Sequence, residues 1–83
     1  MPYIKRDKRL YLRSHLDYAD SQDVGELTYC FYVLCLNYIK RKGLRYETLA
    51  AVNGALTNTI QEIYRRIVAP YEDGKILENG DIH

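Results

Sequence analysis

The stretch ELTYCFYVLCLNYIKRKG, residues 26–43, decides the fold. Its apolar residues recur at spacings of four, three and four, the period of one helical face, at Leu27, Phe31, Leu34 and Tyr38. The basic residues that follow suit the negative end of a helix, and Gly43 is the expected left-handed cap. We therefore predict a helix over residues 26–42.

This helix is apolar almost all round, because Cys30, Val33, Cys35, Leu36 and Ile39 fill its other sides. A helix of this kind has to be covered from several directions. Two further helices would each cover one sector, and the strip left over would be an apolar patch that soluble monomers seldom expose. We therefore predict a homo-oligomer, in which copies of the chain cover one another.

Two more helices are predicted, over residues 7–18 and 46–69. In the second of these, apolar residues keep spacings of three and four over five turns, at Leu49, Val52, Leu56, Ile60, Ile63 and Ile67. Asp23 is placed to cap the helix over residues 26–42. Gly54 lies inside the helical pattern, and we expect it to allow close helix crossing.

Pro70 either ends or kinks the third helix, since proline has no backbone N–H to continue it. After it, residues 71–78 are predicted to form a last short helix, and residues 79–81 a turn. The predicted fold is all-α: a small three-helix domain with a long central hairpin of helices and a short helical or irregular C-terminal tail. The length of 83 residues allows a single domain, residues 1–83.

Composition places the chain among ordered globular proteins, with 47% hydrophobic residues. The net charge of +1 argues against a globally basic nucleic-acid binder. Charge is blocked along the chain, with basic residues at 5–13 and 40–45 and acidic ones at 17–26 and 72–81. We expect opposite blocks to face each other or a neighbouring subunit. The nine Tyr suit positions that are partly exposed to solvent, either at the edge of the core or at interfaces.

The first residues run straight into charge with no apolar segment, so no secretion signal is predicted. The longest apolar run is too short to span a membrane, which requires about 20 residues. A cytoplasmic location without membrane contact is therefore expected. Cys30 and Cys35 point about 140° apart on a helix, which disfavours a mutual disulfide, and we interpret both as small buried hydrophobes.

The sequence contains no motif typical of catalysis or metal binding. There is no CxxC motif, no Gly-rich phosphate loop, no His-Glu-x-x-His and no calcium-loop spacing of carboxylates. His15 lies on an apolar helical face and is interpreted as a boundary residue. We predict a protein that is not an enzyme and that has no metal site and no cofactor.

One group of residues supports a binding hypothesis. If the second and third helices form an antiparallel hairpin, their lengths place Arg65 and Arg66 beside the N-terminal end of the second helix. Guanidinium groups and free backbone N–H groups together favour a phosphate or carboxylate. Tyr64, Tyr71 and Tyr29 are the expected stacking partners. The alternative is that acidic residues at the same end neutralise both arginines, namely Asp20, Asp23 and Glu26.

Three segments carry a resemblance to a known family: the opening MPYI, residues 38–49 (YIKRKGLRYETL), and residues 64–82 (YRRIVAPYEDGKILENGDI). The chain resembles a family of short uncharacterised proteins from bacteriophages and bacteria over almost its whole length. The Cys-containing middle and the terminal His83 depart from that pattern. The resemblance implies a phage-type setting, in which small accessory proteins often inhibit or sequester host factors, including nucleotide signals. It implies no mechanism.

Three functions remain open from the sequence. The leading hypothesis is a non-catalytic, phage-type accessory protein that sequesters a small anionic ligand such as a signalling nucleotide, as a form of counter-defence in the host cytoplasm. The second is an inhibitor that occupies a host protein through its Tyr-rich, charge-blocked surface. The third is nucleic-acid binding through the basic residues at 5–13 and 40–45, which salt should weaken steeply.

Overall fold

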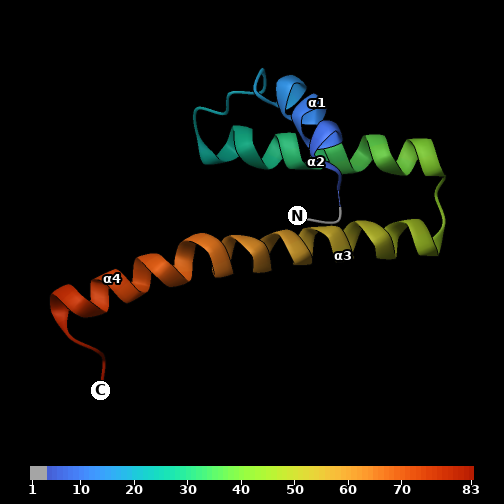
Figure 1. Cartoon of the computed structure of the whole chain (residues 1–83). Coiled ribbons are helices and arrows are strands. Elements are labelled where there is room, and N and C mark those ends of the chain that lie inside the picture. The colour runs from blue at the N-terminus through green and yellow to red at the C-terminus, as the bar shows by residue number, and fades with distance from the viewer. Residues whose placement is uncertain (1–3) are drawn as a thin grey trace. The chain divides into compact units, whose positions relative to one another are not determined.

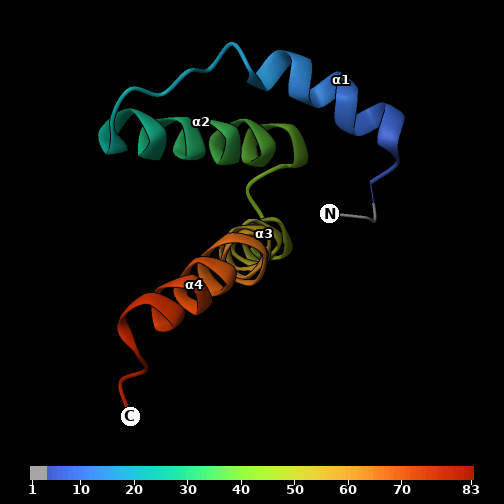
Figure 2. The same cartoon turned by 60° about the vertical axis from the view of Figure 1, so that its left-hand side comes forward.

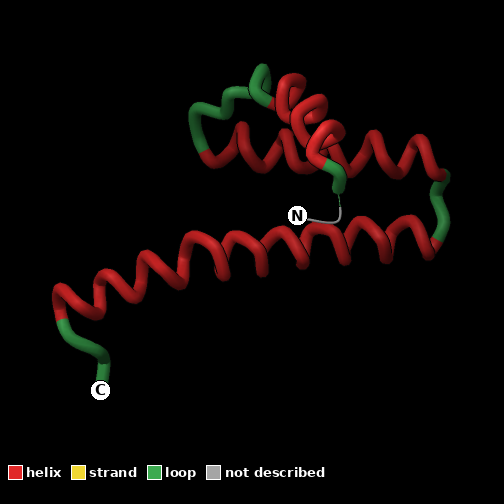
Figure 3. Tube along the Cα trace, in the orientation of Figure 1, coloured by secondary structure: helices red, strands yellow, loops and turns green. Residues whose placement is uncertain are grey.

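The structure, a computed structural model, describes residues 4–83. It is all-α, as predicted, and no strand occurs among the described residues (Figure 3). The helices are α1 (Arg6–Leu16), α2 (Val24–Lys42), α3 (Tyr46–Ile63) and α4 (Ala69–Asn79), and a π-helical turn, η1 (Tyr64–Val68), joins the last two (Figure 1). The Met-Pro-Tyr that opens the resemblance lies outside the described residues.

The chain divides into two compact units, Met1–Asn37 and Tyr38–His83, and the boundary falls inside α2. The first unit contains α1, the loop after it and most of α2. The second contains the last turn of α2, the turn at Gly43 and the helical run from α3 through η1 to α4. The single domain and the helical hairpin expected from the sequence stay predictions.

Helix α1 ends two residues earlier than the predicted 7–18. Asp17 still bonds to the Arg13 carbonyl, but the next backbone N–H groups, of Tyr18 and Ala19, bond three residues back, to His15 and Leu16. Bonds of this kind tighten and end a helix. Tyr18 therefore lies in the loop, where 90% of it is exposed.

Helix α2 begins at Val24 instead of the predicted residue 26, because Asp23 caps it. The Asp23 Oδ1 accepts the Glu26 backbone N–H at 2.8 Å, and the Glu26 Oε1 accepts the Gln22 backbone N–H at 3.2 Å. This pair of bonds resembles a capping box, in which the Glu26 carboxylate would accept the backbone N–H of the cap residue Asp23. Here it accepts the N–H of Gln22, one residue earlier. The predicted role of Asp23 is confirmed.

The predicted cap at Gly43 is also confirmed. Gly43 has φ of 99°, and its N–H bonds to the Ile39 carbonyl at 2.8 Å. Gly80 ends α4 in the same way, with φ of 82° and a bond to the Ile76 carbonyl. Both are glycines because only a residue without Cβ adopts this conformation at little cost.

The predicted helix over residues 46–69 corresponds to α3 and η1, and the predicted short helix over residues 71–78 lies within α4. Helical structure continues through Pro70, so of the two alternatives at this proline the kink is confirmed. The helix absorbs Pro70 through η1, in which the Ala69 N–H bonds five residues back to the Tyr64 carbonyl. The wider turn lies just before Pro70, whose ring would clash with the carbonyl four residues back in an α-helix. Figure 2 views α3 nearly along its axis while α4 runs off obliquely, so the helical run changes direction at η1.

The π turn also corrects the predicted apolar stripe. Because bonds in η1 join residues five apart, Val68 and not Ile67 follows Ile63 on the same face. We call the resulting face the α3 stripe, and it consists of Leu49, Val52, Leu56, Ile60, Ile63 and Val68.

Within its own unit, Gly54 meets no crossing helix, and its interpretation as a close-crossing position stays a prediction. Gly54 lies inside α3, and a Cβ built on it meets no other atom within 4 Å. Gly74 in α4 has equally open surroundings. No other element of the second unit requires either glycine.

Replacing Gly54 with Ala should therefore stabilise the protein. Alanine is better than glycine in a helix interior by about 1 kcal/mol, which raises the Tm of a domain this size by about 4–8 °C. The same change at Gly43 is the matched control, and it should destabilise because alanine is strained at φ of 99°. A thermal melt of each variant measures both effects. A loss of stability in Gly54→Ala would show that another surface approaches α3 at that point.

Candidate functional site

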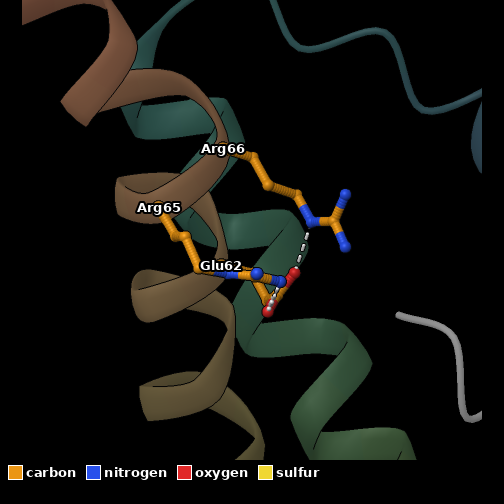
Figure 4. A network of polar contacts seen from close by, with 3 residues as sticks. All are labelled: Glu62, Arg65 and Arg66. Atoms are coloured by element: carbon orange, nitrogen blue, oxygen red, sulfur yellow. Dashed lines mark hydrogen bonds and ion pairs between the residues drawn. The ribbon is translucent and has the colours of Figure 1, made fainter. Parts of the chain in front are cut away.

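The two arginines of the predicted site share one carboxylate on their own helical run. Glu62 accepts from the Arg65 terminal nitrogen at 3.1 Å and from the Arg66 Nε at 2.6 Å (Figure 4). Spacings of three and four residues place the three side chains on adjacent turns. We call Glu62, Arg65 and Arg66 the arginine cluster.

The arginine cluster keeps one positive charge, because a single carboxylate faces two guanidinium groups. The Arg66 Nε makes the bond to Glu62, and both terminal nitrogens of Arg66 point away from that carboxylate (Figure 4). The side chains of Arg65 and Arg66 are 66% and 56% exposed. The cluster therefore presents oriented N–H donors to solvent, which is the arrangement that binds phosphate or carboxylate.

Hydrogen bonds from Arg66 and then Arg65 hold the pKa of Glu62 below its ordinary value of 4.5. A carboxyl group whose pKa is lower in the folded state contributes stability above its unfolded pKa and loses it as the pH falls through the folded one. Glu62 therefore stays ionised and holds both arginines at neutral pH. Sequence reasoning missed Glu62, although its spacing to Arg65 and Arg66 is typical of helical ion pairs.

A pH titration of Glu62→Gln tests this role. The parent should lose part of its stability as the pH falls below 4.5, while the variant should lack that component, because its amide does not titrate. Thermal melts between about pH 3 and pH 7 give the difference. An identical profile for Glu62→Gln and the parent would contradict the assignment.

Tyr64 and Tyr71 lie on the same helical run as the arginine cluster. They are 54% and 64% exposed, so their rings are open to a ligand. The Lys75 ammonium lies 5.5 Å from the centre of the Tyr71 ring, a cation–π distance. Tyr29, the third predicted stacking residue, belongs to the other unit, and its place beside the arginines stays a prediction.

Tyr29 lines an open hollow of about 460 Å³ in the first unit, formed where the loop after α1 meets the start of α2. Carboxylates of Asp20 and Glu26 stand at this hollow, but each already accepts a local hydrogen bond from Gln22. A second, fully apolar hollow of about 190 Å³ shares Tyr29 with it and reaches Leu34. Asp23 accepts the Glu26 backbone N–H, so each of the three acids has a local hydrogen bond. The carboxylate on Arg65 and Arg66 is that of Glu62, and the alternative pairing with the three acids of the other unit stays a prediction.

The remaining residues singled out in the sequence have structural surroundings. The thiols of Cys30 and Cys35 are free and half-buried, not buried as predicted, and the Ser21 hydroxyl lies 3.7 Å from the Cys30 Sγ. The His15 ring stands edge-on to the Tyr11 ring, 4.7 Å between centres, on exposed α1. Within residues 4–83 no group of His, Cys, Asp or Glu side chains is arranged to hold a metal ion.

Both units expose large apolar side chains. No hydrophobic residue among residues 4–83 is buried, and Thr48 is the one buried residue there. Leu34 is 52% exposed and Ile60 68%. None of the described helices is long and apolar enough to cross a membrane.

These observations define a small all-α protein with an oriented arginine pair and uncovered apolar helical faces. The chain belongs to the family described as Domain of unknown function (DUF6899), whose model matches residues 1–82. The comparisons with curated proteins and with solved structures gave no match.

Proposed function

We propose that the chain is a non-catalytic accessory binding protein that assembles from several copies and takes up a small phosphate-bearing anion at the arginine cluster. The observation that carries the proposal is the geometry of Arg66, which holds Glu62 through Nε and leaves its terminal nitrogens free for a ligand. Glu62 orders both guanidinium groups before a ligand arrives, which lowers the entropic cost of binding.

A nucleotide is the ligand class that fits the surroundings best. Its phosphate would meet the arginines, and its base would have the exposed rings of Tyr64 and Tyr71 on the same helical run. Stacking on an aromatic side chain is worth about 1–3 kcal/mol per base. In the phage-type setting implied by the resemblance, the ligand would be a host signalling nucleotide, and sequestration would serve counter-defence.

A thermal-shift screen of linear and cyclic nucleotides against the parent protein tests the proposal. A ligand that binds only the folded state raises its stability by mass action, by about 2.7 kcal/mol at 100 times its Kd. For a chain of this size that corresponds to roughly 10–20 °C. If no linear or cyclic nucleotide shifts the Tm, the nucleotide proposal is wrong.

A second candidate function, occupation of a host protein, is favoured by the exposed apolar faces. Both units carry large apolar side chains that are about half exposed, such as Leu34 and Ile63. Interfaces are enriched in tyrosine, and the chain has nine. Under this function nucleotides would leave the Tm unchanged, so the same screen separates the two candidates.

A further inference from the structure

We propose that the α3 stripe is the interface on which a second copy of this chain docks, with the two helical runs antiparallel. The proposal deepens the assembly part of the proposed function by naming the surface and the direction of pairing. It rests on the exposure of the stripe within its own unit and on the charges that flank it.

The stripe is a continuous apolar face with nothing in its own unit to cover it. Leu49 and Leu56 are 40% exposed, Ile63 46% and Ile60 68%. The second unit is built on one helical run, and a single helix cannot bury its own stripe. Apolar faces of this kind in soluble proteins mark binding surfaces.

The charges at the two ends of the run favour the antiparallel direction. Lys42 and Arg45 lie just before α3, and Glu72 and Asp73 lie in the first half of α4. Ion pairs among residues 4–83 join side chains at most four residues apart, and Glu72 and Asp73 take part in none of them. These acids are therefore available to a second copy. Arg45 is paired with Glu47 of its own chain at 3.3 Å, but its side chain is 62% exposed and has further N–H donors for a second carboxylate.

The register follows from the stripe itself. Its midpoint between Leu49 and Val68 is also the midpoint between Arg45 and Glu72, because each pair is symmetric about residues 58 and 59. Antiparallel pairing about this point sets Arg45 of one copy opposite Glu72 of the other, twice in a two-fold dimer. Parallel pairing would instead set Arg45 beside Arg45 and Glu72 beside Glu72. Repulsion between the like charges would disfavour this arrangement.

A second copy fits this face better than a membrane surface does. The acidic residues of α4, among them Glu72 and Asp73, would be repelled by anionic lipid headgroups. The net charge of +1, in contrast, leaves little overall repulsion between two copies.

Mixed-cysteine crosslinking of the full chain tests the proposal. Leu49→Cys and Val68→Cys are made separately in a Cys30→Ala/Cys35→Ala background, mixed, and treated with a short bismaleimide. Antiparallel pairing predicts crosslinks between the Leu49→Cys and Val68→Cys chains in the mixture, and at least tenfold fewer with either variant alone. Asn58→Cys is the matched control. It lies at the midpoint but on the opposite face of α3, about 160° from Leu56 at 100° per residue, so it should not crosslink.

Each other outcome overturns the proposal in a distinguishable way. Crosslinks with each variant alone and few in the mixture would show parallel pairing. Crosslinks at Asn58→Cys alone, or none in a sample that remains multimeric by light scattering, would place the interface on another face and leave assembly intact. A monomeric sample without crosslinks would overturn both this interface and the assembly part of the proposed function. In that case the stripe would be covered by the first unit of the same chain or would bind lipid vesicles.

Discussion

Leu34→Asp should prevent folding or assembly, or lower the Tm by more than about 10 °C. Leu34 is 52% exposed in the described chain and borders the apolar hollow beside Tyr29. In an assembly that covers this face, the change removes about 1.5–3 kcal/mol of apolar burial and adds an unpaired charge to an apolar contact. On a surface that stays in water, the same change would alter stability by about 0.5 kcal/mol at most.

Thr28→Asp is the matched control for Leu34→Asp. It adds the same charge to α2 at an exposed polar position about 120° from Leu34, at 100° per residue. Thermal melts together with light scattering separate a loss of folding from a loss of assembly. If Leu34→Asp melted like the parent and like Thr28→Asp, the face of α2 that contains Leu34 would be exposed in solution, and assembly would not cover this helix.

Replacing Arg65 and Arg66 together with Ala should abolish stabilisation by any nucleotide that the parent binds. The parent should gain roughly 10–20 °C at 100 times the Kd, and the double variant should gain nothing. The free double variant should remain folded, since exposed ion pairs such as those to Glu62 contribute about 0–1 kcal/mol. Thermal melts with and without the nucleotide measure both quantities.

Lysine at the same two positions sharpens the result. It keeps the positive charge and loses the planar fork, so the nucleotide shift should shrink markedly while the free protein is almost unchanged. Arg13→Ala is the matched control, because Arg13 also lies four residues from an acid, Asp17, at 4.0 Å. It should keep the full nucleotide shift. An equal shift in the parent and the double-Ala variant would show that the ligand binds elsewhere.

Local signals in the sequence were sufficient for the helix caps. Asp23 and Gly43 were predicted as the caps of α2, and both are confirmed by hydrogen bonds within four residues of each position. Such features depend on short-range chemistry that a sequence displays directly. The exact start of α2 was missed by two residues because the cap at Asp23 makes Val24 the first helical residue.

The course of the chain at Pro70 could not be predicted in the same way. A proline within a helical pattern favours either an end or a kink. The structure uses a π turn and continues the helix as far as Asn79, which changes the face that Val68 and Ile67 occupy. The choice depends on the backbone register of η1, which the spacing of apolar residues does not reveal.

The candidate site was predicted in part. Arg65 and Arg66 were selected for their chemistry, whereas Glu62, which holds them, was overlooked although it lies three and four residues away. The expected position of the arginines beside α2 relied on helix lengths and on a hairpin, and it stays a prediction. Relations between distant segments depend on packing that local patterns do not specify.

The central claim is that copies of the chain cover one another's apolar faces, and the mass of the particle tests it most directly. Native mass spectrometry of protein purified from infected or signalling-active cells should return a multiple of the 9.8 kDa chain mass, with any retained anion as additional mass. Light scattering at micromolar concentration should give the same multiple. A particle of 9.8 kDa in both measurements would contradict the account.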